Sequence, residues 1–179
     1  MSPNDILAFW FEQTPSEQWW KVDPAFDALV RERFLGLVNQ AAAGELHAWR
    51  ANAKGRLAEI LVLDQFPRNI HRGTPGAFAC DPVALVLAQE AVAAGALAEL
   101  TPTERSFLLL PYMHSESRRI HEVAEALYRE HAPPTNLDFE LRHKAIVDRF
   151  GRYPHRNRIL GRESTPEEIE FLTQPGSSF

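Results

Sequence analysis

The chain repeats one polar motif in two places. The first motif copy covers residues 64–70 and reads Asp-Gln-Phe-Pro-Arg-Asn-Ile; the second, looser copy covers residues 148–159 and keeps the order Asp, Phe, Pro, Arg-Asn, Ile. Each copy is expected to place a carboxylate at a helix end and an Arg-Asn pair in the turn beyond it. Arginine presents a planar fork of donors suited to carboxylate or phosphate, and asparagine can orient it or a ligand. The repeat therefore predicts a polar site built from two halves.

Several members of the two copies could clamp an anion, because turns on a helical scaffold commonly present ligand-binding residues. The alternative is that these side chains only tie loops to exposed helix carbonyls. Asp64 lies on the buried stripe of its helix and must be paired, with Arg68 or Arg156 as the natural partners. It could be an internal salt bridge or the anchor of an active arginine. The predicted ligand-binding residues in and directly after the two copies are Asp64, Arg68, Asn69, Arg72, Arg156 and Asn157.

Two histidines are candidates for general acid–base chemistry. His114 stands in the run Pro-Tyr-Met-His-Ser-Glu over residues 111–116, and His155 lies inside the second motif copy. Glu116 joins the predicted ligand-binding set. In the alternative reading Ser115 caps a helix that begins there, Glu116 is favourable in its first turn, and His114 is incidental. His143 is expected to point inward as a hydrogen-bonded core residue.

The chain lacks the sequence motifs of common metal, nucleotide and hydrolase sites. His121 and Glu125 resemble part of a zincin helix, but the second histidine is missing, so no metal site is predicted. Phosphate-binding glycine motifs and the G-x-S-x-G elbow are also absent. We therefore expect no metal and no cofactor.

Composition indicates an ordinary globular protein of 179 residues, read as one domain over 1–179, with 45% hydrophobic and 24% charged residues. The net charge of −5 argues against a nucleic-acid partner, although five arginines fall between Arg149 and Arg162. The single Cys80 fits a reducing compartment. No signal peptide is visible and no apolar run approaches the length of a membrane span, so we expect a cytoplasmic protein with no membrane partner. A homodimer is possible through apolar residues on the terminal helices.

Helix signals follow one another along the whole chain, whereas alternating strand patterns are nearly absent. Helices are expected over residues 2–11, 23–44, 54–66, 81–95, 101–110, 116–131 and 137–150, with a last short one from Thr165. Capping boxes mark the starts at Thr101 and Thr165. The fold class is therefore predicted as all-α, with stacked antiparallel helical hairpins.

Several of these motifs together resemble a known family. They are Phe9-Trp10-Phe11, Trp19-Trp20, residues 63–69, Phe78-Ala79 with Asp81, residues 111–116 and residues 149–157. In these the chain is similar, over essentially its whole length, to the domain of unknown function 924 family. The resemblance implies a tetratricopeptide-like stack of antiparallel helices. It implies no activity, because the family is uncharacterised.

Three functional hypotheses follow. The leading one is a binding module whose Arg- and Asn-lined helical groove holds an anionic ligand, either a peptide carboxylate or a small phosphorylated metabolite. The second is a hydrolase or transferase acting on an anionic small molecule, with His114 or His155 as general acid–base. In the third, both motif copies are internal struts and function lies elsewhere.

Overall fold

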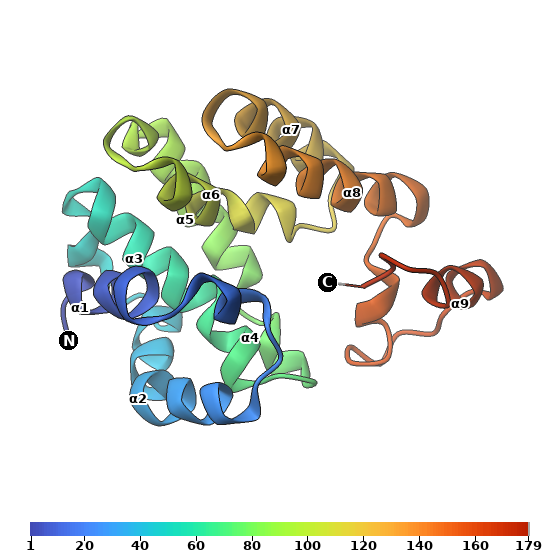
Figure 1. Cartoon of the computed structure of the whole chain (residues 1–179), viewed down its shortest axis with the longest axis horizontal. Coiled ribbons are helices and arrows are strands. Elements are labelled where there is room, and N and C mark those ends of the chain that lie inside the picture. Colours follow the sequence, from blue (N-terminus) through green and yellow to red (C-terminus); the bar gives the residue numbers. More distant parts are fainter. Residues whose placement is uncertain (179) are drawn as a thin grey trace.

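The computed structural model describes residues 1–178. All regular secondary structure in this part of the chain is helical (Figure 1). The predicted all-α class is confirmed. The α-helices, in chain order, are α1 (Pro3–Leu7), α2 (Pro24–Ala42), α3 (Ala53–Asp64), α4 (Phe66–Ile70), α5 (Asp81–Ala93), α6 (Pro102–Met113), α7 (Arg118–His131), α8 (Pro134–Phe150) and α9 (Pro166–Leu172).

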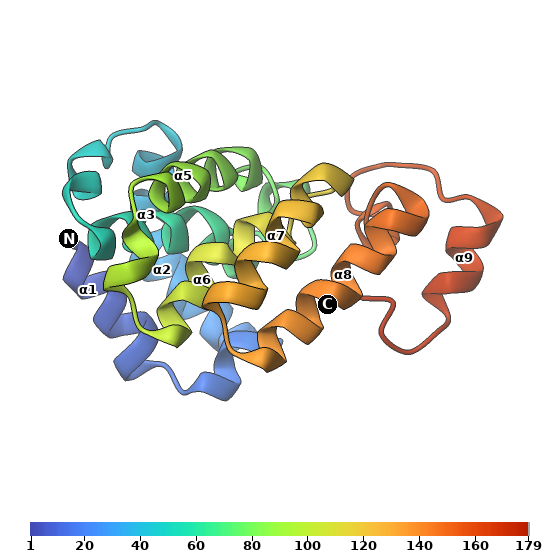
Figure 2. The same cartoon turned by 90° about the horizontal axis from the view of Figure 1, so that it is seen from above.

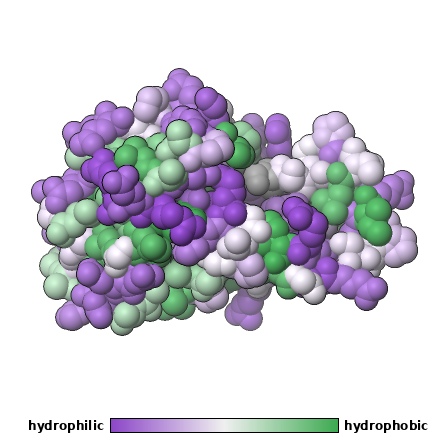
Figure 3. Space-filling view, turned by 90° about the horizontal axis from the view of Figure 1, so that it is seen from below, coloured by the Kyte–Doolittle hydropathy of each residue, from purple (hydrophilic) through white to green (hydrophobic). Residues whose placement is uncertain are grey.

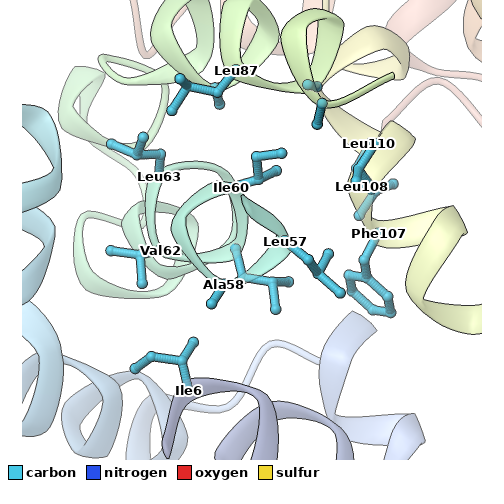
Figure 4. Packing of buried hydrophobic residues seen from close by; sticks show 14 of the residues in the cluster. Ile6, Leu57, Ala58, Ile60, Val62, Leu63, Leu87, Phe107, Leu108 and Leu110 are labelled. Atoms are coloured by element: carbon cyan, nitrogen blue, oxygen red, sulfur yellow. The ribbon is translucent and has the colours of Figure 1, made fainter. Parts of the chain in front are cut away.

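Helix α3 is the centre of the core. Of its 12 residues, 10 are buried, because its sequence is apolar on nearly every side. It packs against α1, α2, α5 and α6. Figure 4 looks along this helix and shows Ile6 on one side, Leu87 on the opposite side and Phe107 beside Leu57. A helix enclosed in this way carries its last residue, Asp64, into the interior.

The second half of the chain continues the stack by adding one helix to the next. Helix α5 packs on α6, α6 on α7, and α7 on α8, as both ribbon views show (Figures 1 and 2). Short turns join these helices, so successive pairs form the predicted hairpins. The closer likeness to tetratricopeptide proteins stays a prediction.

The C-terminal part has a small core of its own. Ile146, Val147 and Tyr153 are buried together, and Phe150 and Phe171 pack against them. Helix α9 lies at the far end of the molecule in Figure 1. On the face shown in Figure 3, hydrophilic side chains cover much of the larger part, and apolar patches also reach the C-terminal end. Ile169 of α9 is 57% exposed, and the homodimer stays a prediction.

Most helix starts follow the sequence signals. Thr101 and Thr165 each form the predicted capping box with the glutamate three residues later, and the side chain of Asp23 caps α2. Gly95 adopts a left-handed φ of 78° after α5, a conformation that favours glycine.

Several helix boundaries differ from the prediction. The first α-helix ends at Leu7 instead of Phe11, and a π-helical segment, Ala8–Gln13, continues from it. The helix expected over 54–66 ends at Asp64, and a new short helix begins before Pro67, because proline favours the first turn of a helix. Helix α8 already begins at Pro134 rather than at residue 137.

Helix α6 gives the correction that matters most for the site. It runs through Pro111 to Met113, so His114 lies at its C-terminal end and not at the start of the next helix. Proline inside a helix costs about 3 kcal/mol. Burial of the following Tyr112 and Met113, which are 3% and 4% exposed, offsets that cost. Helix α7 starts only at Arg118, and its N-cap position is Ser117 instead of Ser115.

By length and composition alone, one segment of the described chain, Pro75–Ala93, is apolar enough to cross a membrane. A single such segment is weak evidence, since core helices of soluble proteins pass the same test. Its regular helix is α5, which has 13 residues and therefore spans about 20 Å, less than the hydrocarbon core of a bilayer.

Candidate functional site

Asp64 is the buried centre of the site. Its side chain is 1% exposed, and its Oδ1 lies 2.7 Å from Nδ1 of His114. Its Oδ2 accepts a hydrogen bond of 2.5 Å from the amide of Gln65. The end of α3 thus meets the end of α6, and the predicted acid and the predicted histidine become direct partners.

The charges around this pair set its protonation. Burial alone would raise the pKa of Asp64, but Arg68 and His114 outweigh burial and hold that pKa well below its usual range. An ionised carboxylate can only accept, so Nδ1 of His114 carries the proton and donates it to Asp64. Burial, and then Arg68, lower the pKa of His114. The imidazole is therefore neutral at pH 7 and keeps a lone pair on Nε2.

Arg68 joins this pair to a second carboxylate. Its guanidinium donates to both oxygens of Asp81, at 2.8 and 3.0 Å, and also to the backbone carbonyl of Asp64 at 2.5 Å. The distance from Arg68 Nη1 to Asp64 Oδ1 is 3.6 Å. Most of the hydrogen-bond donors of Arg68 are therefore used within the protein, and its side chain connects α4 to the start of α5.

Arg156 reaches the same Asp81 from the C-terminal part. It is 7% exposed, and its guanidinium carbon lies 4.6 Å from the ring centre of Phe78 and 4.7 Å from that of Tyr153. Its Nη1 is 3.5 Å from Asp81, the only carboxylate within 4 Å of it among the described residues. Its buried Nε has no hydrogen-bond acceptor there. Burial, and then Arg68, lower the pKa of this guanidinium.

These residues form what we call the junction cluster, an unbroken chain of contacts from the end of α6 to the C-terminal part. Its members are His114, Asp64, Arg68, Asp81 and Arg156. Four of the five belong to the predicted site residues.

A buried network behind the cluster holds the turn that carries His114. His121 and Glu140 are both 0% exposed, and His121 Nδ1 lies 2.7 Å from the carboxyl of Glu140. Its Nε2 is 2.8 Å from the carbonyl oxygen of Ser115. The hydroxyl of Tyr153 donates to the carbonyl of Met113 at 2.5 Å. Two side chains thus fix the backbone on either side of His114.

The two motif copies are not equivalent, although the sequence predicted a carboxylate at a helix end and an Arg-Asn pair in each. Asp148 of the second copy is 43% exposed and pairs with Lys144 one helical turn earlier, whereas Asp64 is buried. Asn157 binds Ser164 and Glu168 through its amide nitrogen and Arg162 through its oxygen. These contacts connect Asn157 to other residues of the C-terminal part. The Arg-Asn pairs also lie in helical turns rather than in open loops.

Other predicted residues lie outside the cluster. Arg72 and Asn69 both donate to Asp27 of α2. Glu116 accepts two hydrogen bonds from Arg162, at 2.6 and 2.9 Å, and one from the backbone of Tyr153. The ring centre of His155 is 5.6 Å from that of Tyr153, and burial, and then Arg156, lower its pKa to about 4.

Sequence reasoning missed Asp81, Phe78 and Tyr153. The pair Asp81-Pro82 resembles an ordinary helix start, and α5 does begin there, but Cys80 occupies the cap position and makes no side-chain cap bond. The carboxylate of Asp81 faces Arg68 and Arg156 instead. Phe78 and Asp81 both contact Arg156 from at least 75 positions away in the chain, a separation that local patterns do not reveal.

Two hollows on the described surface, of ≈ 370 and ≈ 350 Å³, lie near α1 and α2. Neither is lined by a residue of the junction cluster. Within residues 1–178 no group of three or more His, Cys, Asp or Glu side chains is placed to hold a metal ion.

Comparison with known proteins gives a family but no activity. Residues 6–176 match the DUF924 family, described as a bacterial protein of unknown function. A solved structure of a protein of unknown function, ATU0120 from Agrobacterium tumefaciens, is 40% identical, with a TM-score of 0.89 over 95% of this chain and 96% of that chain. No curated protein matches. Matched over nearly its whole length, the chain belongs to the DUF924 family.

Proposed function

We propose that the protein binds the anionic group of a small ligand at the junction cluster, with Arg156 as the main donor. The observation that carries this proposal is the incomplete pairing of Arg156: a buried guanidinium whose Nε lacks an acceptor among the described residues and whose one carboxylate contact is long, at 3.5 Å. A buried donor without an acceptor costs about 1–3 kcal/mol. An oxygen of a bound anion would supply the missing acceptor.

Other arginines of the chain are paired more completely than Arg156, which supports the proposal. Arg72, Arg152 and Arg162 each donate two hydrogen bonds to one carboxylate, at distances between 2.6 and 2.9 Å. Bidentate pairs of this kind are typical of an arginine with a structural role. Arg156 has no such pair, because Asp81 already receives both of its close hydrogen bonds from Arg68.

The surroundings of Arg156 favour binding in a second way. The rings of Phe78 and Tyr153 both lie within stacking distance of its guanidinium carbon and hold its plane. A donor fixed before the ligand arrives loses little side-chain entropy when it binds. The junction cluster is thus prearranged for an anion, with Arg68 as the second positive charge.

Isothermal titration with inorganic phosphate and with acetate tests the proposal. We expect binding of at least one of them by the wild type, weakened about 10- to 100-fold in Arg156→Gln, since a charge-assisted hydrogen bond contributes about 1.5–3 kcal/mol. Arg156→Lys keeps the charge and should lose less. Arg72→Gln is the matched control, because Arg72 belongs to the surface pair with Asp27 and should bind as the wild type does. Wild-type protein that binds neither anion, or Arg156→Gln that binds equally well, would contradict the proposal.

A further inference from the structure

The Asp64–His114 pair has features that anion binding does not need. Asp64 occupies one ring nitrogen of His114 at 2.7 Å, and the imidazole side chain is 15% exposed. The other nitrogen, Nε2, keeps its lone pair. A buried carboxylate behind a neutral imidazole is an arrangement that activates the imidazole as a base or a nucleophile.

Resting on the proposed function, we propose that His114 accepts a phosphoryl group on Nε2 from a phosphate monoester or phosphoramidate held by the arginines of the junction cluster. The ligand class is thereby narrowed from anions in general to phosphoryl compounds. Two guanidiniums, Arg68 and Arg156, meet at one carboxylate in this cluster. A phosphoryl group spreads more negative charge over its three terminal oxygens than a carboxylate does over two, so it gains more from the positive charge of Arg68 beside the donors of Arg156.

The transfer balances without an added oxidant or reductant. The lone pair of His114 Nε2 forms a bond to phosphorus while the bond from phosphorus to the leaving oxygen or nitrogen breaks. The leaving group departs with that electron pair and takes a proton from water. Positive charge develops on the ring, and Asp64 stabilises it through the proton on Nδ1. Attack by water on phosphorus then returns the electron pair to Nε2 and releases inorganic phosphate and a proton.

The arginines and Asp64 have separate parts in this step. Arg68 and Arg156 stabilise the negative charge spread over the phosphoryl oxygens, the main requirement of phosphoryl transfer. Asp64 is a positioning residue, because it touches the imidazole and not the phosphoryl group. It is itself held by Gln65 and by Arg68.

The other buried histidine with a close carboxylate is unsuited to the same reaction. His121 is 0% exposed, and Glu140 and the carbonyl of Ser115 lie within hydrogen-bond distance of its two ring nitrogens. His143 directs Nδ1 to the carbonyl of Phe139, 2.7 Å away. Among these buried rings, His114 combines a carboxylate on one nitrogen with partial exposure of the side chain.

Phosphoramidate, a small chemical donor of phosphoryl groups to histidine, tests the inference. The folded protein is incubated with it, and peptide mapping by mass spectrometry follows each of the seven histidines over time. We expect His114 to be labelled at least about tenfold faster than His47, which is exposed in the same molecule. This internal comparison needs no variant. Labelling of His114 no faster than that of His47 would overturn the inference.

Variants separate this inference from the binding proposal. Arg156→Gln should slow the labelling of His114 and leave His47 unchanged, while His114→Gln should lose the label and still bind inorganic phosphate. In Asp64→Asn the pH midpoint of any remaining labelling of His114 should shift downward, because Asp64 raises the pKa of that imidazole. If phosphate binds through Arg156 but His114 is not preferentially labelled, only the phosphoryl-transfer inference fails. If phosphate does not bind at all, both the anion-binding proposal and the phosphoryl-transfer inference are wrong.

Discussion

Replacing Asp64 with asparagine should destabilise the protein by about 3 kcal/mol. The change keeps the shape of the side chain but removes a charge that is 1% exposed. Hydrogen bonds to charged groups are worth about 1.5–3 kcal/mol and neutral ones about 1, so weakening those from His114 and Gln65 costs about 2 kcal/mol. Loss of the carboxylate near Arg68 adds about 1 kcal/mol, and this term is small because Arg68 keeps both bonds to Asp81.

The second motif copy supplies the control for this experiment. Asp148 is 43% exposed and pairs with Lys144 within one helix, so Asp148→Asn should cost no more than about 0.5 kcal/mol. Urea unfolding at pH 7 measures both variants against the wild type, with equal m-values as the check that the unfolded states match. For a chain of this size about 3 kcal/mol corresponds to a fall of about 6–12 °C in Tm. Equal losses in the two variants would refute the conclusion that only the first copy has a buried carboxylate.

Two further predictions concern pH and backbone packing. Burial, before any other cause, lowers the pKa of His143 to about 3 and that of His155 to about 4, so between pH 7 and 5 the unfolded chain takes up protons that the folded protein does not. Urea unfolding should show a loss of about 2–4 kcal/mol over this range, smaller in His143→Gln, and an unchanged stability would contradict the assignment. Gly55→Ala should cost about 2–3 kcal/mol or more, because its Cβ would lie 1.8 Å from the carbonyl oxygen of Trp49. Gly36→Ala, with nothing within 4 Å, should instead stabilise α2 by about 0.5–1 kcal/mol, and the reverse order of the two would count against this packing.

The helical fold could be predicted because its signals are local. Threonine caps followed three residues later by glutamate, prolines at first turns and glycine at Gly95 act within one or two turns of the chain. At Pro111, prediction from local signals fails. A local rule ends the helix there, but burial of the next turn against other helices outweighs the proline.

The site could be predicted only in part, for a similar reason. The buried stripe of α3 correctly indicated that Asp64 needs a partner, and Arg68 is one. The partner of Arg156, however, is Asp81, 75 residues away in the chain. The repeat could not show how the two copies differ: Asp64 is buried while Asp148 is exposed, and Arg68 lies closer to Asp81 than Arg156 does.

The position of Arg156 gives the junction cluster a consequence for stability. Tyr153, stacked on Arg156, belongs to the small C-terminal core, whereas Arg68 and Asp81 extend from the helices of the main core. An anion held by Arg156 and Arg68 would therefore connect the two cores as well as satisfy a donor. A ligand that binds only the assembled junction stabilises it by mass action, about 2.7 kcal/mol at 100 times its Kd. Slower hydrogen exchange in the C-terminal part on addition of phosphate, lost in Arg156→Gln, would be the sign of that connection.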